Sequence, residues 1–288
     1  MVTGVVAGWE WDESLFAGTA AYYRRGRLPY AAGLAEALAG VLGLDGRGRL
    51  LDVGCGPGTV GLTLVDLFGE VVGVDPDAGM IEEAVRAAAA RGVAGKTRWV
   101  RARAEELPAG LGEFTVVALA QSFHWMDRAL VAATVRDMLR PGGALVHISD
   151  VKPDVKEDPS AAGGALPWPV VPYEAVQELV VRHLGPVRRA GRGVLPQGTP
   201  GGEEEYYARA GFAGPERHVV PGGEEWERTA DDVVAWVFSL SSSAPHLFGA
   251  ELSVFESELR SLLGRASPAG RFSERGPGTE AVVWRKAP

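Results

Sequence analysis

A glycine-rich turn between an apolar segment and a helical segment constrains the fold of this chain more than any other feature. The apolar segment covers residues 49–53, glycines follow at 54, 56 and 58, and a helix is predicted over residues 59–68. Glycine adopts positive φ without strain and leaves no Cβ where a backbone must pass close to a ligand. A strand, a glycine turn and a helix in this order predict the ligand-binding crevice of a doubly wound α/β sheet.

The alternation of apolar strands with helices continues to about residue 150. Further strands are predicted over residues 70–74, 97–102, 114–120 and 144–148, and helices over 31–43, 78–91 and 127–140. Near-continuous apolar strands between helices indicate a parallel sheet that is buried on both faces. The chain is therefore predicted to have an α/β fold built on a doubly wound, Rossmann-like sheet.

The composition changes after residue 150. Residues 151–202 are rich in Pro and Gly, and since a structureless linker of this length is unusual in a compact chain, we expect a structured helical lid. Helices are predicted over 173–183, 203–211, 229–240 (with Thr229 as N-cap) and 244–263, and strands over 216–220 and 280–285. We expect residues 1–150 to hold N-terminal helices and the α/β core. We expect residues 151–288 to hold the lid segments and the last two strands of the same sheet.

An acidic residue, Asp75, ends the second predicted strand. A carboxylate at this position accepts hydrogen bonds from the ribose hydroxyls of an adenosine group. A dinucleotide site reads G-x-G-x-x-G, because a pyrophosphate sits on the helix N-terminus. Here the third glycine is Gly58 and position 59 is Thr. S-adenosylmethionine (SAM) has no phosphate, so the spacing favours a SAM site over an NAD-dependent oxidoreductase or a turn used only for packing.

Five stretches make the chain resemble the class I SAM-dependent methyltransferases, in particular the small-molecule branch labelled methyltransferase type 11. The stretches are LLDVGCGPGT (50–59), VVGVDP (71–76), AEELP (104–108), AQSFHWMD (120–127) and LRPGGAL (139–145). The resemblance covers about residues 20–150 and is looser beyond residue 200. It implies methyl transfer from SAM and a seven-stranded sheet in the order 3-2-1-4-5-7-6, with strand seven antiparallel.

The resemblance also implies roles for individual residues in binding SAM. Gly54, Gly56 and Gly58 would face its methionyl part, and Gln121 would contact the methionyl backbone. Asp75, which Pro76 follows, would hold the ribose. Met80 would cover one face of the adenine, and Ala104 and Glu105 would lie beside its edge. Tyr23 and Arg27 would fold over the SAM carboxylate, or else form an exposed basic helix end. Two positions depart from the family, since Arg103 and Thr115 stand where Asp is usual.

Three residues after the fourth and fifth strands are candidates for the active site. Trp125 would wall the pocket for the sulfonium, because a cation is attracted to an aromatic face. His124 is either a general base or a structural residue that fixes the loop. Asp150 either binds a substrate amine or hydroxyl or caps its own loop. Alignment alone supplies much of the acceleration in such a transfer, so the absence of a sharper catalytic motif does not argue against an enzyme.

Composition narrows the choice of partner and cofactor. The chain has 29 Lys and Arg against 37 Asp and Glu, a net charge of -8, which disfavours nucleic acid and suits a neutral or cationic small molecule. Its single cysteine, Cys55, excludes an internal disulfide and fits a reducing cytoplasm, and its five histidines show no zinc-ligand spacing. We expect no metal, no signal peptide and no membrane span.

The sequence therefore predicts methyl transfer to a nitrogen or oxygen atom of a small metabolite, of natural-product type and with an amino sugar (an aminoglycoside amine) as one example. The alternative from a different class is a non-catalytic protein that binds SAM or its product, S-adenosylhomocysteine (SAH).

Overall fold

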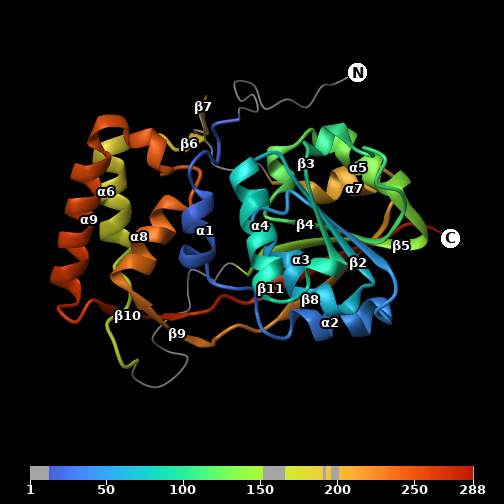
Figure 1. Ribbon diagram of the computed structural model, residues 1–288, viewed down its shortest axis with the longest axis horizontal. Coiled ribbons are helices and arrows are strands. Elements are labelled where there is room, and N and C mark those ends of the chain that lie inside the picture. The colour runs from blue at the N-terminus through green and yellow to red at the C-terminus, as the bar shows by residue number, and fades with distance from the viewer. Residues whose placement is uncertain (1–12, 152–165, 191–192, 196–200, 288) are drawn as a thin grey trace. The chain divides into compact units, whose positions relative to one another are not determined.

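The computed structural model describes residues 13–151, 166–190, 193–195 and 201–287 (Figure 1). The predictions about the N-terminal ten residues, and the parts of the predicted lid that fall on residues 152–165, 191–192 and 196–200, lie outside these ranges. The chain divides into two compact units. We call Met1–Pro29, Lys152–Gly198 and Gly222–Pro277 the helical unit, and Tyr30–Val151, Thr199–Pro221 and Gly278–Pro288 the sheet unit.

The sheet unit contains a seven-stranded sheet in the order β3-β2-β1-β4-β5-β11-β8 (Figure 1). The strands are β1 (Arg49–Val53), β2 (Glu70–Asp75), β3 (Thr97–Arg101), β4 (Phe114–Ala120), β5 (Leu139–Asp150), β8 (Ala213–Val220) and β11 (Thr279–Arg285). β11 runs antiparallel to both of its neighbours, while β1 to β5 pair in parallel. The predicted fold class and strand order are confirmed, with β8 and β11 as the sixth and seventh strands.

Helices cover both faces of this sheet. They are α2 (Leu34–Leu42), α3 (Thr59–Thr63), α4 (Ala78–Ala90), α5 (Arg128–Met138) and α7 (Glu203–Arg209), with the short 3-10 turns η1 (Val65–Leu67), η2 (Ala94–Lys96), η3 (Ala104–Glu106) and η4 (Phe123–Trp125). Side chains of α2 and α3 pack into one hydrophobic layer, and those of α5 and α7 pack into the other. Asp77 and Asp127 start α4 and α5, because each carboxylate accepts a backbone N–H from the first turn.

The boundaries of β5 and α5 differ from the prediction. α5 ends at Met138, and Leu139 already pairs with Phe114 of β4. The pairing then shifts register, so that Ala144 faces Val116. Residues 140–143 therefore bulge out of β5 instead of forming a turn before it, because Gly142 has positive φ (72°).

In its described residues the helical unit combines helices with small β-ribbons (Figure 1). Its elements are α1 (Ala20–Gly26), α6 (Tyr173–Leu184), α8 (Ala230–Phe238), η5 (Pro245–Glu251), α9 (Leu252–Ala266), β6 (Arg189–Ala190), β7 (Gly193–Val194), β9 (Glu225–Thr229) and β10 (Arg271–Arg275). α6, α8 and α9 share a core that includes Phe238, Phe255 and Leu259. The predicted helix over 244–263 is interrupted at Gly249 (φ 52°, ψ -125°), so α9 begins only at Leu252.

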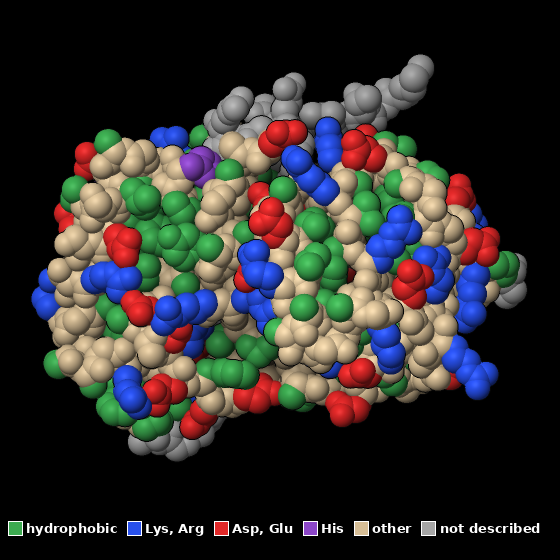
Figure 2. Space-filling model, in the orientation of Figure 1, with side chains coloured by type: hydrophobic (Ala, Val, Ile, Leu, Met, Phe, Trp, Pro, Cys, Tyr) green, Lys and Arg blue, Asp and Glu red, His purple; other side chains and the backbone are tan. Residues whose placement is uncertain are grey.

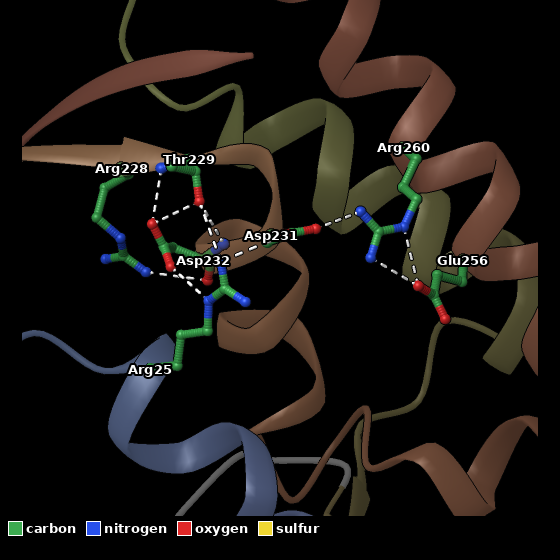
Figure 3. Close-up of polar contacts among 7 residues, drawn as sticks. All are labelled: Arg25, Arg228, Thr229, Asp231, Asp232, Glu256 and Arg260. Atoms are coloured by element: carbon green, nitrogen blue, oxygen red, sulfur yellow. Dashed lines mark hydrogen bonds and ion pairs between the residues drawn. The ribbon is translucent and has the colours of Figure 1, made fainter.

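A polar network connects α1, α8 and α9 (Figure 3). The Arg25 guanidinium donates to Asp232 at 2.7 Å and also pairs with Asp231 at 3.3 Å. Arg260 on α9 donates to Asp231 at 2.6 Å and pairs with Glu256 one turn earlier at 2.8 Å. Asp232 also completes the predicted cap of α8, because it accepts the N–H of Thr229 at 2.7 Å while the Thr229 hydroxyl accepts the N–H of Asp232. The network thus connects α1 and α9 to the first turn of α8.

A second ion pair lies in the interior of the helical unit. Arg228 on β9 is 4% exposed and contacts Glu274 on β10 at 2.6 Å. The same guanidinium donates to the carbonyl oxygen of Gly26 at 2.7 Å, and the Tyr173 hydroxyl donates to the other oxygen of Glu274. A buried guanidinium such as that of Arg228 stays charged in the folded protein only when partners hold it by ion pairs and hydrogen bonds.

Candidate active site

The glycine-rich turn follows β1 directly. Gly54, Gly56 and Gly58 all have positive φ, at 68°, 51° and 79°. The N–H groups of Gly54 and Cys55 donate to the carbonyl oxygen of Val74 at 2.9 and 3.0 Å. The turn is therefore hydrogen-bonded to the end of the neighbouring strand β2.

The three glycines are required for different reasons. A Cβ on Gly54 would lie 2.6 Å from the Cβ of Ser122, and one on Gly58 would lie 2.7 Å from the Trp99 ring. Among the described residues, the atom nearest to a Cβ on Gly56 would be the Met80 sulfur, at 4.0 Å. Packing inside the protein thus excludes side chains at Gly54 and Gly58, whereas no described residue obstructs one at Gly56.

Asp75 lies beside Gly56 at the end of β2. One carboxylate oxygen accepts the N–H of Gly56 at 2.9 Å and the other accepts the N–H of Asp77 at 2.9 Å. Burial raises the pKa of Asp75 to about 6. Pro76 follows on the chain, and Asp77 in turn accepts the N–H of Met80 on α4 at 2.9 Å. The structure therefore brings Gly56, Asp75 and Met80 together, as a site for an adenosine group requires.

A second carboxylate, Asp52, lies beneath the turn and did not emerge as a site residue from the sequence. It is 1% exposed, and its Oδ2 accepts the N–H of Gly61 at 2.9 Å. Its Oδ1 is buried and has no hydrogen-bond partner in the described part of the chain. Burial, opposed by the Gly61 hydrogen bond and reinforced by the charge of Asp75, raises the pKa of Asp52 to about 7.

The residues predicted to lie at the adenine edge form η3, after β3. Ala104 is buried. Glu105 accepts the N–H of Asp127 at 2.9 Å, and its other oxygen lies 3.4 Å from the guanidinium of Arg103. Glu105 therefore ties η3 to the start of α5. Arg103, which stands where the methyltransferases that the sequence resembles usually have Asp, is paired with this neighbouring acid.

Gln121 has an unusual backbone conformation at the end of β4. Its φ is 53° although it is not glycine, a conformation that costs roughly 1–2 kcal/mol. Its N–H donates to the carbonyl oxygen of Ile148 at 3.2 Å, and its side-chain amide donates to Asp150 at 3.3 Å. Strain of this kind concentrates at functional sites, and here it places two exposed polar side chains side by side at the ends of β4 and β5.

His124 and Trp125 lie on η4, immediately after this point. Their rings are 4.7 Å apart. Trp125 is buried and His124 half-buried. Ser122 anchors the loop by donating to the carbonyl oxygen of Val53 at 2.7 Å, and Phe123 stacks on Tyr207 of α7 with ring centroids 4.7 Å apart. η4 is therefore held on a rigid base.

Tyr207 extends this base into the sheet. Its hydroxyl forms a hydrogen bond of 2.9 Å with Nδ1 of His147 on β5. Burial lowers the pKa of His147, which favours the neutral ring. No sequence motif predicts this hydrogen bond between Tyr207 and His147, because α7 and β5 are distant in the sequence.

Tyr23 and Arg27 belong to the helical unit. The Arg27 guanidinium donates to the hydroxyl of Ser239 at 2.8 Å and lies over the Tyr23 ring, 5.1 Å from its centroid. Arg25, two residues earlier in the chain, is engaged with Asp231 and Asp232 (Figure 3). A role of Tyr23 and Arg27 at the SAM carboxylate remains a prediction.

Three further features of the described residues concern metal-ligand groups, membrane-spanning helices and the distribution of surface charge. Over residues 13–151, 166–190, 193–195 and 201–287, no three His, Cys, Asp or Glu side chains converge to hold a metal ion. No helix in those ranges is sufficiently long and apolar to cross a bilayer. On the face shown in Figure 2, acidic and basic side chains are interspersed rather than gathered by sign.

Comparison with known proteins gives consistent results. Residues 50–143 match the family model described as a methyltransferase domain. An uncharacterized methyltransferase of Mycobacterium tuberculosis (strain H37Rv) is 38% identical over 135 residues, which cover 46% of this chain and 51% of the relative. Malonyl-[acyl-carrier protein] O-methyltransferase of Enterobacter lignolyticus is 33% identical over 113 residues, 38% of this chain and 43% of the relative.

The fold is also similar to a solved structure from Anaeromyxobacter dehalogenans, provisionally named a type II methyltransferase. The two share a TM-score of 0.53 and 20% identity, over 91% of this chain and 99% of the other. This likeness concerns the fold alone. The chain spans about half the length of the curated mycobacterial relative that it matches.

Proposed function

We propose that this protein, whose residues 50–143 match a methyltransferase-domain model, is a class I SAM-dependent methyltransferase that transfers a methyl group from SAM to a nitrogen or oxygen atom of a small metabolite. The observation that carries the proposal is the pairing of Gly56 with Asp75. No described residue fills the space in front of Gly56, and the half-buried Asp75 carboxylate accepts the Gly56 N–H at 2.9 Å. This is the arrangement that an adenosine group with two ribose hydroxyls requires.

The residues around this pair fit an adenosyl cofactor. Asp75 would hold the ribose, while Met80 and Ala104 offer buried apolar surface for the adenine. When bound, SAM supplies a methyl group that its sulfonium has already activated. The remaining task of the protein is to align an acceptor and exclude water, which is worth several kcal/mol when the geometry is fixed in advance (about 7 or more in favourable cases). The anchored η4 loop, with Trp125, suits that task.

We assign the acceptor to amine- or hydroxyl-bearing metabolites because of Asp150. Its exposed carboxylate, bonded to Gln121 at 3.3 Å, would attract a protonated amine or accept a hydrogen bond from a hydroxyl. The Enterobacter relative acts, by its name, on a malonyl group, which is acidic and would be repelled by Asp150. An amino sugar of natural-product type fits this charge, and the net charge of -8 argues against nucleic acid. The single cysteine supports a cytoplasmic location.

The proposal is tested first by calorimetric titration of the purified protein with SAH, SAM and NAD. Binding of SAH and SAM is expected, with loss of at least about tenfold in affinity in Asp75→Ala, since a charge-assisted hydrogen bond contributes roughly 1.5–3 kcal/mol. Asp45→Ala, at an exposed carboxylate of the same unit, is the matched control and should bind as the wild type does. Binding of NAD alone would reject the cofactor assignment.

The acceptor is then sought by mass spectrometry with panels of amines, hydroxyl compounds and carboxylic acids. Methylation of amines or hydroxyls, reduced in Asp150→Asn, is the expected result. Methylation of carboxylic acids only would reject the role given to Asp150. Tight SAH binding without methylation of any panel member would favour the non-catalytic alternative.

A further inference from the structure

Three glycines surround the indole ring of Trp99 in the sheet unit. Trp99 lies on β3, in register with Gly73 of β2. A Cβ on Gly73 would lie 2.4 Å from two ring carbons of Trp99, one on Gly58 would lie 2.7 Å from Cη2, and one on Gly61 would lie 3.3 Å from the same atom. Glycine inside a strand often marks the close approach of another group. We call the space bounded by Gly58, Gly61 and Gly73 the indole slot.

Within this slot the ring reaches from β3 across β2 to the glycine-rich turn after β1. Its Cε3 and Cζ3 atoms lie over Gly73, and Cη2 is the ring atom nearest to Gly58 and Gly61. The ring also packs with Leu62 of α3 and with alanines of α4. One side chain therefore connects β2, the turn and the two helices that follow β1 and β2.

Packing, rather than hydrogen bonding, keeps the ring in this place. The Trp99 Nε1 atom is buried and makes no hydrogen bond to any described residue. Burying an N–H without a partner opposes folding, so a smaller apolar residue would avoid a cost that Trp accepts. The features that offset this cost are the apolar area of the ring and its fit to the slot.

We propose that Trp99 is a positioning residue for SAM, which holds the glycine-rich turn at the height at which the Gly56 N–H meets the Asp75 carboxylate. The inference rests on the proposed function. The turn and the end of β2 are the two halves of the proposed cofactor site, and the 2.9 Å hydrogen bond between Gly56 and Asp75 joins them. Without the ring, a void opens beneath Gly58, and the turn moves into it because interiors do not retain voids without cost.

The test compares Trp99→Leu and Trp99→Phe with a matched control, Trp284→Leu. Trp284 lies in the same sheet unit, is 2% exposed, and also has a buried Nε1 without a partner in the described structure. It packs against Tyr207 and lies on β11, which β4 and β5 separate from β1 in the sheet. SAH affinity is measured by calorimetry, and stability by urea unfolding, for all variants.

Trp99→Leu is expected to weaken SAH binding by about tenfold or more, because small misplacements of binding groups are costly. Trp99→Phe should weaken it by roughly threefold, since the shorter ring still fills part of the slot. Trp284→Leu should lower stability to a similar degree as Trp99→Leu and change SAH affinity by less than about twofold. Equal losses of affinity in Trp99→Leu and Trp284→Leu would overturn the inference.

A spectroscopic measurement decides the matter even if Trp99→Leu does not fold. In protein labelled with fluorotryptophan, the resonance missing from Trp99→Phe identifies Trp99, and this resonance should shift when SAH is added. An unchanged Trp99 resonance, in wild-type protein that binds SAH, would overturn the inference and leave the proposed function intact. Absence of SAH and SAM binding to the wild type would overturn both.

Discussion

Replacing Asp52 by Asn should make the protein more stable at alkaline pH and should change the way its stability depends on pH. The carboxyl is 1% exposed and lies beneath the glycine turn. An Asn amide has nearly the same shape, and its oxygen can still accept the N–H of Gly61, which now bonds Asp52 at 2.9 Å. The substitution therefore removes an ionisable group while keeping the contact that positions it.

The magnitude follows from the pKa of Asp52. Burial raises this pKa from 3.8 to about 7, and one pKa unit corresponds to about 1.4 kcal/mol. The raised pKa means that the folded state binds the proton more tightly than the unfolded chain does. Its contribution to stability is therefore fully present below pH 3.8 and is lost as the pH rises to about 7. Ionised Asp52 then costs the folded state about 4 kcal/mol, and an Asn at this position does not carry that cost.

The assay is urea unfolding of the wild type and Asp52→Asn at pH 5 and pH 8. The stability advantage of the variant should grow by roughly 2.5 kcal/mol between these two pH values, because most of the remaining ionisation of Asp52 occurs there. Taking the difference between the two proteins cancels the titration of other groups. Asp45→Asn, at an exposed carboxylate, should leave stability within about 0.5 kcal/mol at both pH values. An Asp52→Asn advantage that is the same at pH 5 and pH 8 would refute the reasoning.

Three further substitutions test the structure by urea unfolding. Gly54→Ala should lower stability by about 3 kcal/mol and abolish SAH binding, because its Cβ is strained at positive φ and meets a neighbouring side chain at 2.6 Å; normal SAH binding would contradict this. Tyr207→Phe should cost about 1 kcal/mol, through loss of the hydrogen bond to His147, and unchanged stability would show that bond to be unimportant. Arg228→Ala should cost about 3 kcal/mol or more, since Glu274 loses its ion pair; a loss below about 1 kcal/mol would contradict a buried pair.

The sequence predicted the sheet core well because local signals define those strands. β1 and β4 have the predicted bounds, since each is a short, mostly apolar segment with turn residues on both sides. Strand order depends on pairing between distant segments, which local patterns do not encode. The strand order was predicted through the resemblance to the methyltransferases. Residues 50–143 match a methyltransferase-domain model, which agrees with that resemblance.

The β9–β10 ribbon of the helical unit was not predicted, for a physical reason. Its strands read EWERT and RFSER, and charged residues dominate both. The inward positions include Arg228, whose charge is neutralised by Glu274 from the partner strand. An ion pair that forms across two distant segments leaves no apolar alternation for a sequence pattern to detect.

The candidate site also contains features that the sequence predicted and features that it did not. Gly56 and Asp75 were predicted, because the turn and the strand end are marked by residue type and spacing. The contacts of Trp99 with Gly58 and of Tyr207 with Phe123 were not predicted, because each joins segments that are distant in sequence. One local signal did exist for Trp99, since Gly73 lies in the middle of a strand, where glycine usually leaves room for a neighbour.

The position of β11 in the sheet has a consequence for the order of events during synthesis. β11 lies between β5 and β8, yet it is translated after both. Until residues 279–285 leave the ribosome, β5 has an unpaired outer edge and β8 has no strand to pair with. Exposed strand edges bind other chains, so the nascent protein is vulnerable to aggregation until β11 is inserted between β5 and β8, which are already synthesised.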